Sequence, residues 1–420
     1  MHDIAGNKAA TPDYDDSQWR HIDVPNDYVQ EGTYNRHNVR NHGYLPYEPA
    51  WYRKHFTMPA TDQGKILRLD FDGVFRDSEV WLNGQFLGRH PGGYTPFSYD
   101  VSKVAKPGAE NVIAVRVDPR QFEGWWNEGG GIYRHVRLAV LPPLHVAQYG
   151  TYVTSTVPNG DQGADDQANL SIQTTMDNQQ SHSATCQILS EIIAPDGKLV
   201  ASVKTDATVP AGSQTQTGQE TTIEKPQLWS IETPNLYQLR TTVLQDGTPV
   251  DFTTTTFGVR TIRYDADKGF FLNGRHVEIQ GTANHQDFAG VGIAAPDSLQ
   301  AWRVEQLKAM GCNAWRTAHN PPSDALLDAC DRLGMMVMDE NRHLGDAETP
   351  KSPSGTTCTN FSELDTMILR DRNHPSIIMW SMCNEERLQG KPEGARLFSM
   401  MMQEVHRFDT TRPITCAMSG

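Results

Sequence analysis

Hydrophobic and polar residues alternate along the first third of the chain, and turn residues interrupt the pattern. Between residues 51 and 142 the alternating segments include ILRLDFDGV, SEVWLNGQFLG, NVIAVRVD and IYRHVRLAVL. The Asn83-Gly84 pair lies between two strand-like runs and favours a tight β-hairpin, because both residues tolerate a positive φ. The pattern predicts an all-β sandwich or jelly roll over residues 1–145.

Short strands continue over residues 146–259, where Thr, Ser, Gln and Asp replace many of the longer side chains. Turn residues recur along this segment, at Pro158-Asn159-Gly160, Pro195-Asp196-Gly197 and Asp246-Gly247. Turns at this spacing between short alternating runs are typical of a second, smaller β-sandwich.

From residue 260 onward, helical periodicity appears between short apolar runs, which predicts alternating strands and helices. Strands are expected at residues 276–282, 313–317, 335–339, 377–383 and 413–417, and helices at 296–311, 323–334, 361–370 and 393–408. In the first helix, Asp297 or Ser298 is the expected cap and Gly311 the stop; in the second, Ser323 and Gly334 have these roles. The buried side of the first helix is expected to carry Leu299, Trp302, Leu307 and Met310.

Five strands and four helices make rather more than half of an eight-stranded TIM barrel, so residues 260–420 are predicted to be an incomplete (β/α)8 barrel. An open half barrel exposes unpaired strand edges. We therefore expect the natural protein to continue beyond residue 420, and the chain alone to be inactive and prone to association. No signal peptide is visible at the N-terminus, but the opening residues resemble the middle of a domain, which leaves the localisation open.

The net charge of -14 and the pI near 5.5 argue against nucleic acid or an anionic membrane as the main partner. No run of 18 apolar residues is present, so we predict no membrane span. The six cysteines are scattered without a CxxC pair, and we interpret them as small core residues.

The segment IIMWSMCNEE is a buried strand followed by carboxylates. In parallel α/β folds, ligands bind at the carboxyl ends of the strands. Strand alternation assigns Ile378, Trp380 and Met382 to the face that packs under helices, and Met379, Ser381, Cys383 and Glu385 to the other face. Glu385 is therefore expected to point into the barrel mouth and Glu386 toward the surface or a helix start. A helix-capping or salt-bridged carboxylate is the alternative interpretation of Glu385.

Polar residues follow the other predicted strands too, and they should meet at one rim. They are Asn284 and His285 after the first strand, Arg316 and His319 around the second, and Asp339 and Glu340 after the third. Such groups can hold sugar hydroxyls, keep a carboxylate ionised and protonate a leaving oxygen. Taken singly, each has a structural alternative: a buried ion pair for Arg316, a loop residue for His319 and a hydrogen-bonding partner for Asp339.

Several long motifs in this order resemble glycoside hydrolase family 2, which contains β-galactosidases, β-glucuronidases and β-mannosidases. The barrel motifs are GTANHQDFAGVG, MGCNAWRTAHNPPSDALLDACDRLGMMVMDEN and RDRNHPSIIMWSMCNEE. Earlier stretches agree, among them PDYDDSQWRHIDVPNDY, VWLNGQFLGRHPGGYTPF, GGGIYRHVRL and PQLWSIETPNLY. The resemblance covers nearly the whole chain.

The resemblance implies a sugar-binding-like jelly roll, an immunoglobulin-like sandwich and a TIM barrel, with retaining hydrolysis of terminal β-glycosides. The acid/base Glu of the family's strand-four motif falls on Glu385, and the Asn that contacts the sugar near its 2-hydroxyl falls on Asn384. His285, Arg316 and His319 fall on matching pocket positions. The RDRNHPS stretch precedes the strand and is expected to be structural, at the lower face of the barrel.

Retaining hydrolysis needs a second carboxylate about 5 to 5.5 Å from the acid, as nucleophile. In the family this is a Glu on strand seven, beyond residue 420, and Glu340 is the less favoured stand-in within the chain. DENRHLGD lacks the Glu-x-His pair through which some family members bind magnesium, so no metal or other cofactor is predicted. The Asp that several members carry ahead of GIYR is not clearly matched; Glu123 and Glu128 are candidate substitutes.

We expect an exo-acting β-glycosidase whose substrate is an oligosaccharide or other β-glycoside, with β-galactosides favoured over β-glucuronides. A homo-oligomer of the full-length protein is left open. The alternative from another class is a non-catalytic carbohydrate-binding fragment built on the two β-domains.

Overall fold

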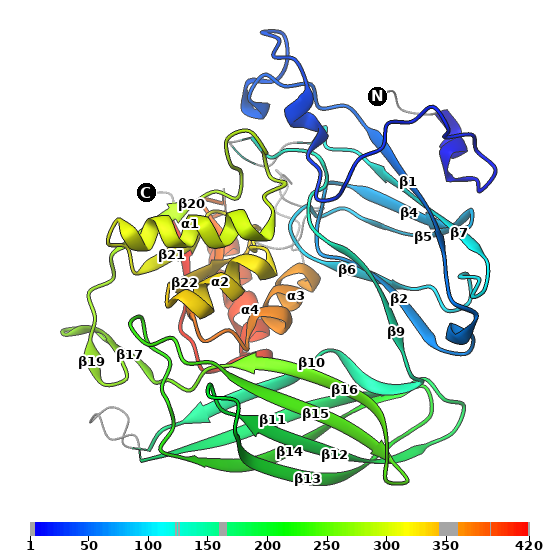
Figure 1. Ribbon diagram of the computed structural model, residues 1–420. Coiled ribbons are helices and arrows are strands. Elements are labelled where there is room, and N and C mark those ends of the chain that lie inside the picture. Colours follow the sequence, from blue (N-terminus) through cyan, green and yellow to red (C-terminus); the bar gives the residue numbers. More distant parts are fainter. Residues whose placement is uncertain are drawn as a thin grey trace. The chain divides into compact units, whose positions relative to one another are not determined.

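A computed structural model describes residues 5–121, 124, 127–158, 166–343, 360–386 and 388–418 (Figure 1). Contacts divide the chain into two compact units. The first comprises residues 1–141, 285–296 and 343–363, and the second comprises residues 142–284, 297–342 and 364–420. None of the helices in the described ranges combines the length and apolar character that a membrane crossing requires.

The first unit is built around a sandwich of antiparallel sheets. One sheet has the order β1-β7-β4-β5, another has the order β6-β2-β9, and β3 pairs with β8. Alternating residues of these strands, such as Leu67, Leu69 and Phe71 in β2, are buried in the shared core. The bounds are β1 Ala50–Thr57, β2 Ile66–Phe71, β3 Val74–Phe75, β4 Ser78–Leu82, β5 Gln85–His90, β6 Phe97–Asp100, β7 Glu110–Val117, β8 Gly131–Ile132 and β9 Val136–Leu141, with short 3-10 helices at Ala5–Ala10, Tyr28–Glu31, Arg40–His42 and Ala60–Asp62.

The hairpin expected in this sandwich is confirmed. Strands β4 and β5 pair antiparallel with Leu82 opposite Gln85. Asn83 and Gly84 between them have φ values of 52° and 82°. Both turn residues are left-handed, as a tight two-residue hairpin requires.

Residues 285–296 belong to the first unit, where the Asp27 carboxylate anchors them. Its oxygens accept hydrogen bonds from the backbone N–H groups of Val29 (3.2 Å), Gly130 (3.0 Å) and Ile293 (3.0 Å). Burial raises the pKa of Asp27 to about 6, although these hydrogen bonds oppose the shift. One buried carboxylate thus holds together three segments that are distant in sequence.

The second unit contains another antiparallel sandwich, with sheets ordered β10-β11-β14 and β13-β12-β15-β16. The predicted turn at Asp246-Gly247 joins β15 to β16, with φ values of 50° and 77°. Gly197 also has a positive φ, and Asn159 and Gly160 lie outside the described residues. The bounds are β10 Leu144–Thr156, β11 Gln167–Asn178, β12 Ala184–Ile193, β13 Leu199–Val209, β14 Ser213–Glu224, β15 Tyr237–Gln245 and β16 Thr248–Phe257.

The strand predicted over residues 276–282 is wrong as a single element. Residues Arg275–His276 form β19, the last strand of a small antiparallel sheet, whereas the first barrel strand, β20, spans Gly281–Asn284. The cause is a hairpin at Asn273-Gly274, whose φ values are 51° and 73°. The other two strands of this small sheet are β17 (Ile262–Asp265) and β18 (Gly269–Leu272).

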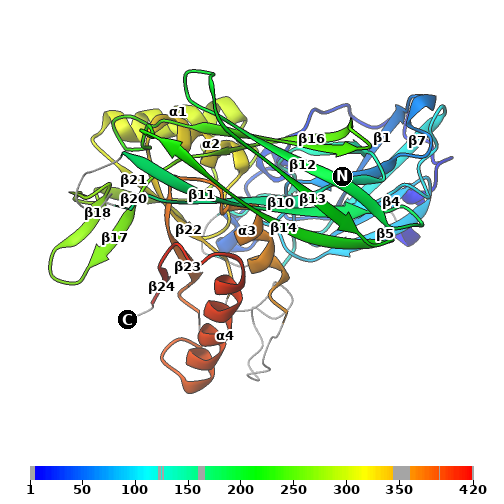
Figure 2. The same cartoon turned by 90° about the horizontal axis from the view of Figure 1, so that it is seen from below.

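A parallel sheet ordered β20-β21-β22-β23-β24 follows, which confirms the βα alternation of an incomplete TIM barrel. The Ser323 hydroxyl caps α2 at Leu326 N–H, and Gly334 ends this helix with a φ of 70°, as predicted. Helices α1 and α2 lie side by side in both views (Figures 1 and 2). The bounds are β21 Ala314–Thr317, β22 Met336–Glu340, β23 Ile377–Asn384, β24 Ile414–Ala417, α1 Asp297–Ala309, α2 Asp324–Leu333, α3 Ser362–Asp371 and α4 Pro392–Phe408.

The predicted buried face of α1 is wrong for Trp302 and Met310, whereas Leu299 and Leu307 are half-buried. Trp302 is 45% exposed and Met310, just after the helix, is 74% exposed, whereas Gln300 and Val304 are buried. Lys308 extends the same stripe, and its ammonium group donates to the carbonyl oxygens of Ile231 and Gly334 at 3.1 Å. A hydrophobic pattern misses this face because two of its three members are polar.

The sandwich and the barrel segment of the second unit share buried polar contacts. The Trp229 indole donates to the Asp331 carbonyl at 2.8 Å, and the Tyr152 hydroxyl donates to Asp409 at 2.9 Å. The Asn373 amide accepts from Val153 N–H and donates to the Thr151 carbonyl, at 2.9 and 2.8 Å. We call this boundary between the sandwich and the barrel segment the seam. Asn373 belongs to the RDRNHPS stretch, so this stretch has a structural role at the seam, as its position before the strand predicted.

Asp409 is the most connected carboxylate of the seam, because it also accepts from Trp380 Nε1 and Arg412 Nη1, both at 2.7 Å. Burial raises its pKa, but the ion pair with Arg412 and the hydrogen bonds outweigh this effect and lower it. We expect Asp409→Ala to cost about 3 to 5 kcal/mol of unfolding free energy, because it leaves the buried Arg412 cation unpaired.

Denaturant unfolding of the wild type and of Asp409→Ala checks this prediction, and Asp196→Ala is the control. Asp196 is an exposed carboxylate paired with Lys198 and should matter little. Because the folded-state pKa of Asp409 is lowered, its contribution should be present at neutral pH and lost as the pH falls below about 4. An equal effect of both substitutions at pH 7 would contradict the assignment.

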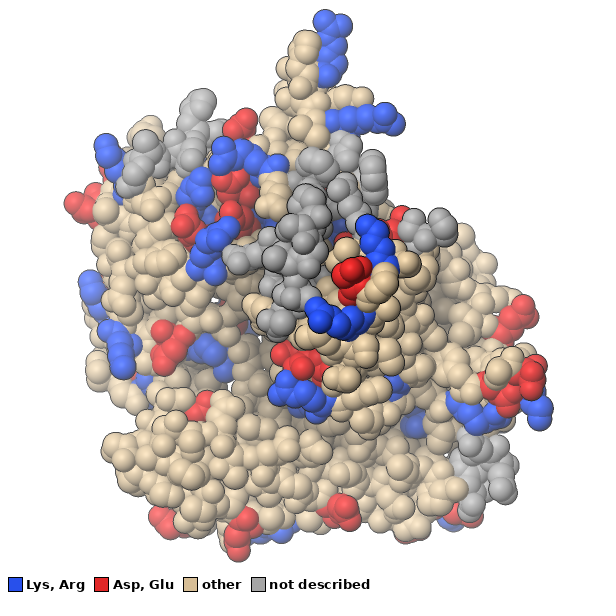
Figure 3. All heavy atoms as spheres, turned by 180° about the vertical axis from the view of Figure 1, so that it is seen from behind, with Lys and Arg blue, Asp and Glu red and all other residues tan. Residues whose placement is uncertain are grey.

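Acidic and basic side chains are interspersed over the face drawn in Figure 3, and the sandwich at the lower end of that view carries few charges. This agrees with the Thr, Ser and Gln of β13, β14 and β16. Among the described residues on this face, Lys and Arg therefore do not gather into one continuous patch.

Candidate active site

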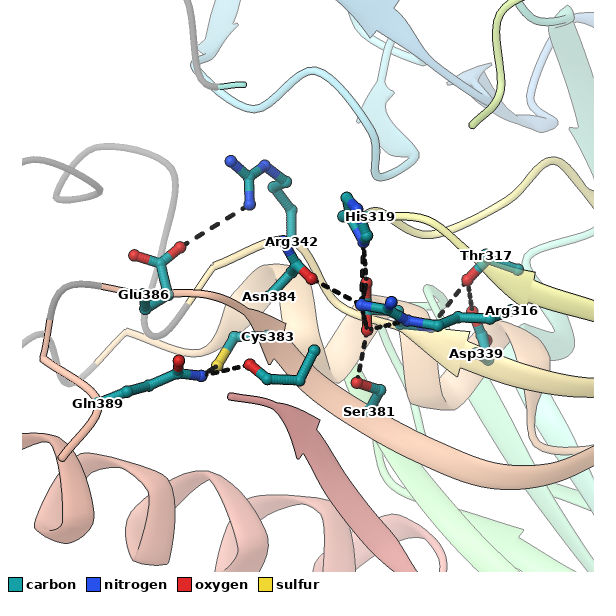
Figure 4. Close-up of polar contacts among 12 residues, drawn as sticks. Arg316, Thr317, His319, Asp339, Arg342, Ser381, Cys383, Asn384, Glu386 and Gln389 are labelled. Atoms are coloured by element: carbon teal, nitrogen blue, oxygen red, sulfur yellow. Dashed lines mark hydrogen bonds and ion pairs between the residues drawn. The ribbon is translucent and has the colours of Figure 1, made fainter. Parts of the chain in front are cut away.

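Three of the predicted residues converge at the carboxyl ends of the parallel strands. Figure 4 shows Arg316, His319 and Asn384 pointing toward one another. Arg316 lies on β21, His319 follows that strand, and Asn384 is the last residue of β23. Nη2 of Arg316 donates to the Asn384 side-chain oxygen at 2.6 Å. The site therefore joins strands that are adjacent or nearly adjacent in the sheet.

Glu340, the last residue of β22, lies at the centre of this group and is fully buried. Its carboxylate accepts from Nε of Arg316 at 3.0 Å and from Nη2 at 2.9 Å, which is a two-pronged ion pair. Nδ1 of His319 lies 2.8 Å from the same carboxylate, and the Ser381 hydroxyl donates to it at 2.7 Å. A carboxylate with this many donors is poorly disposed to attack a sugar, which argues against Glu340 as a stand-in nucleophile.

The alternation expected along β23 holds as far as Ser381 and then changes. Trp380 donates to Asp409 on one side of the strand, whereas Ser381 bonds Glu340 on the other. The pairing of β23 with β24 then shifts register between Ser381 and Asn384. As a result Asn384 joins the Arg316 side, where strict alternation would have placed Cys383. A bulge is a common way to re-aim a side chain beside an active site.

Glu385 directly follows β23 and is exposed. Its φ is 49°, so the chain turns sharply at this residue, and its N–H donates to the Ala417 carbonyl at 3.0 Å. The backbone of Glu385 is thus hydrogen-bonded to the adjacent strand β24, while the Glu385 side chain is solvent-accessible. This arrangement is compatible with proton transfer to a bound ligand.

The next residue, Glu386, has a different environment. Its carboxylate lies 3.8 Å from Nη1 of Arg342, and Figure 4 shows this pair apart from the Arg316 group. Gln389 also supports the strand end, since its amide donates to the Ala417 carbonyl at 2.7 Å. The two adjacent glutamates are therefore distinguished by structure as well as by sequence.

Asp339 is fully buried, and the Thr317 hydroxyl lies 3.4 Å from its oxygen. Burial raises the pKa of Asp339 well above its ordinary value, and the negative charge of Asp371 raises it further. Asp371 itself pairs with Arg370, with Nη2 at 2.7 Å from the carboxylate. These contacts support the structural interpretation of Asp339 over contact with a substrate.

We expect Asp339→Asn to gain stability relative to the wild type as the pH rises from 4 to 7. A raised folded-state pKa means that the wild type loses stability as pH rises above the unfolded-state pKa of about 3.9. Asn stays neutral and can copy the hydrogen bonds of a protonated Asp. Denaturation midpoints of both proteins at the two pH values check this. Parallel pH dependence would contradict it. Asp371→Asn removes the nearer of the two carboxylates that pair with Arg370 and should destabilise the protein at both pH values.

His285 follows β20 and belongs to the first unit, as does the whole 285–296 segment. Glu128, one candidate for the carboxylate ahead of GIYR, is fully buried in the first unit, where the Tyr94 hydroxyl donates to it at 3.4 Å. Glu123, the other candidate, lies outside the described residues. His285 and Glu128 therefore stay predictions for the substrate site.

Among the described residues, Asp328, Asp331 and His374 form a group whose ligand atoms lie within 4.8 Å of one another. Asp331 already accepts from Nδ1 of His374 at 2.6 Å and from Ser376 N–H at 3.0 Å. Burial lowers the pKa of His374, but the Asp331 carboxylate outweighs this and raises it to about 9. A protonated imidazole does not bind a metal, so we interpret this group as an ion pair.

Sequence reasoning missed Thr317 and Ser381, the two hydroxyls that support Glu340. The Thr317 hydroxyl accepts from Glu340 N–H at 2.9 Å, and Ser381 bonds the carboxylate itself. A Ser in an otherwise apolar buried strand was the available signal, because a buried hydroxyl needs a partner.

Three family descriptions match successive parts of the chain. They are "Glycosyl hydrolases family 2, sugar binding domain" over residues 20–142, "Glycosyl hydrolases family 2" over residues 151–260, and "Glycosyl hydrolases family 2, TIM barrel domain" over residues 265–420. The chain belongs to glycoside hydrolase family 2. Its three-part fold is the one that the motifs predicted.

Similar family 2 proteins carry two different names. The chain is 40% identical to the β-galactosidase BoGH2A of Bacteroides ovatus over 388 residues, and this alignment covers 90% of this chain and 45% of that protein. It is 30% identical to a β-glucuronidase of Bacteroides fragilis, over 87% of this chain and 54% of that protein. The chain thus spans about half the length of these relatives.

Solved structures of family 2 proteins superpose closely on the chain. A family 2 member from Bacteroides cellulosilyticus has a TM-score of 0.91 at 35% identity, covering 100% of this chain and 56% of its own. A Bacteroides uniformis β-glucuronidase has a TM-score of 0.85 at 29% identity, covering 98% and 50%.

Proposed function

We propose that the protein containing this chain is a retaining exo-β-glycosidase that hydrolyses terminal β-galactosides. The observation that carries the proposal is the Arg316-Asn384 hydrogen bond beside Glu385 at the ends of the parallel strands. This grouping offers a cation, an amide and an accessible carboxyl group at the edge where ligands of such sheets bind. Membership of family 2 supports the same reaction.

In this proposal Glu385 donates its proton to the departing glycosidic oxygen and then, as a carboxylate, takes a proton from the attacking water. Its accessible side chain at the turn after β23 suits both steps. Asn384 and His319 hold sugar hydroxyls. Arg316 stabilises the carboxylate nucleophile, which the family carries on strand seven, through its Nη1 group. Within the described residues, Nη1 makes no hydrogen bond, while Nε and Nη2 are engaged.

The β-galactoside assignment rests on the relative with 40% identity, and the β-glucuronidase names of other relatives support the alternative. Purified full-length protein should be assayed with 4-nitrophenyl β-galactoside and 4-nitrophenyl β-glucuronide side by side. Proton NMR of the first product should show the β-anomer before mutarotation, as retention requires. Faster turnover of the glucuronide would show that β-glucuronides are the preferred substrates. An α-anomer as the first product would rule out retention.

A non-catalytic carbohydrate-binding role is the competing proposal from another class. It predicts that the full-length protein binds galactosides without releasing nitrophenol. The assay above separates the two proposals, because release of nitrophenol by the purified full-length protein excludes a pure binding protein. Loss of activity on an alkyl β-galactoside in Glu385→Gln then attributes the turnover to this site.

A further inference from the structure

Glu340 has no acceptor position left for a sugar. A carboxylate offers about four lone-pair sites. Oε2 accepts from Nε and Nη2 of Arg316 and from the Ser381 hydroxyl, at 2.7 to 3.0 Å, and Oε1 lies 2.9 Å from Nη2 of Arg316 and 2.8 Å from Nδ1 of His319. The side chain is also fully buried. These contacts exclude the direct substrate contact that its place at a strand end predicted.

The position of Glu340 is fixed from both neighbouring strands. Its N–H donates to the Thr317 hydroxyl at 2.9 Å, and Thr317 ends β21. On the other side, Ser381 of β23 is its partner in the parallel pairing, and the Asn341 N–H donates to the Ser381 carbonyl at 2.8 Å. The carboxylate is therefore held by backbone and side-chain contacts that do not involve a ligand.

Two consequences follow for the residues that face the sugar in the proposed function. The ion pair through Nε and Nη2 fixes the plane of the Arg316 guanidinium, whose side chain is 23% exposed. His319 is affected through its ring nitrogen. Nδ1 lies 2.8 Å from Oε1 of Glu340 and 3.0 Å from Nη2 of Arg316. Because a carboxylate only accepts, the shorter contact is a hydrogen bond when Nδ1 carries the proton. In a neutral ring Nε2 is then the acceptor.

We propose that Glu340 is a positioning residue, which orients the Arg316 guanidinium and fixes the tautomer of His319 without touching the substrate. This inference rests on the proposed glycosidase function. It assigns to Glu340 a role in the chemical step rather than in substrate affinity. Loss of the carboxylate should therefore lower kcat and leave KM nearly unchanged.

Glu340→Gln in the full-length protein is the first test. The amide presents a donor to at least one of the groups that now donate to Glu340, so Arg316 or His319 must turn away. We expect kcat on the better of the two nitrophenyl glycosides to fall by roughly 100-fold or more, with KM changed less than about threefold. Glu340→Asp, which keeps the charge but is one methylene shorter, should recover part of kcat. Glu305→Gln, the same substitution at an exposed glutamate of α1, is the matched control and should retain full activity.

The second test does not depend on the folding of a variant. Crystals of the wild-type full-length protein soaked with galactose, and separately with glucuronate, should show the sugar bound without a hydrogen bond to Glu340. A sugar hydroxyl bonded to either oxygen of Glu340 would overturn the inference, as would unchanged kcat in a folded Glu340→Gln variant. Absence of wild-type turnover on both glycosides would instead refute the proposed function, so the two failures are distinguishable.

Discussion

Glu385→Gln in the full-length protein is expected to lower kcat by roughly 1,000-fold on an alkyl β-galactoside and by less than about tenfold on an activated aryl galactoside. An alkoxide is a poor leaving group and needs a proton as the bond breaks, whereas a nitrophenolate leaves without one. Gln keeps the shape of the side chain and cannot supply this proton. The expected result is thus a difference between two substrates, which a general loss of folding would not produce.

Steady-state kinetics on the two substrates measure this difference, and Glu386→Gln is the matched control. Glu386 is the adjacent carboxylate and is paired with Arg342 at 3.8 Å. Its substitution should affect both substrates alike and only slightly. Equal losses on the two substrates for Glu385→Gln would show that Glu385 is not the proton donor.

Arg316→Ala is expected to have the second largest effect, a loss of about 100-fold or more in kcat with little change in KM. The substitution removes the cation proposed to stabilise the nucleophile. It also leaves the fully buried Glu340 without its ion-pair partner, and an unpaired buried charge is costly. A lower thermal midpoint should therefore accompany the kinetic defect.

Arg316→Lys separates these two effects. Lysine keeps the charge, but it cannot make the two-pronged contact with Glu340 and also reach Asn384. It should recover more stability than activity. Arg332→Ala, at an exposed arginine on α2, is the control for both measurements. Near wild-type kinetics for Arg316→Ala would mean that the site lies elsewhere.

Much of the fold was predictable because local signals agreed with the final structure. The Asn83-Gly84 hairpin and the Ser323 and Gly334 caps are examples in which a few neighbouring residues decide the local conformation. The face of α1 was not predictable in this way. It buries Gln300 and uses Lys308 to reach carbonyl oxygens that are distant in sequence, so tertiary contacts override the hydrophobic pattern.

The candidate site shows the same division. The βα alternation alone predicted that polar residues gather at the strand ends, and Arg316, His319 and Asn384 do meet there. The orientation of each side chain did not follow, because the register shift in β23 reverses the alternation after Ser381. A one-residue change of register moves side chains to the opposite face, and it leaves no composition signal in the sequence.

The seam of the second unit has a consequence for recombination between family 2 proteins. Trp229, Tyr152 and Thr151 come from the sandwich side, whereas Asp331, Asp409 and Asn373 come from the barrel side. A crossover placed near residue 260, at the predicted boundary between the two domains, would therefore separate hydrogen-bond donors from the acceptors that they contact across this seam. Chimeras should be viable when both parental sequences carry compatible partners at these positions, and exchange of the sandwich and barrel as one block should be tolerated better than exchange of either part.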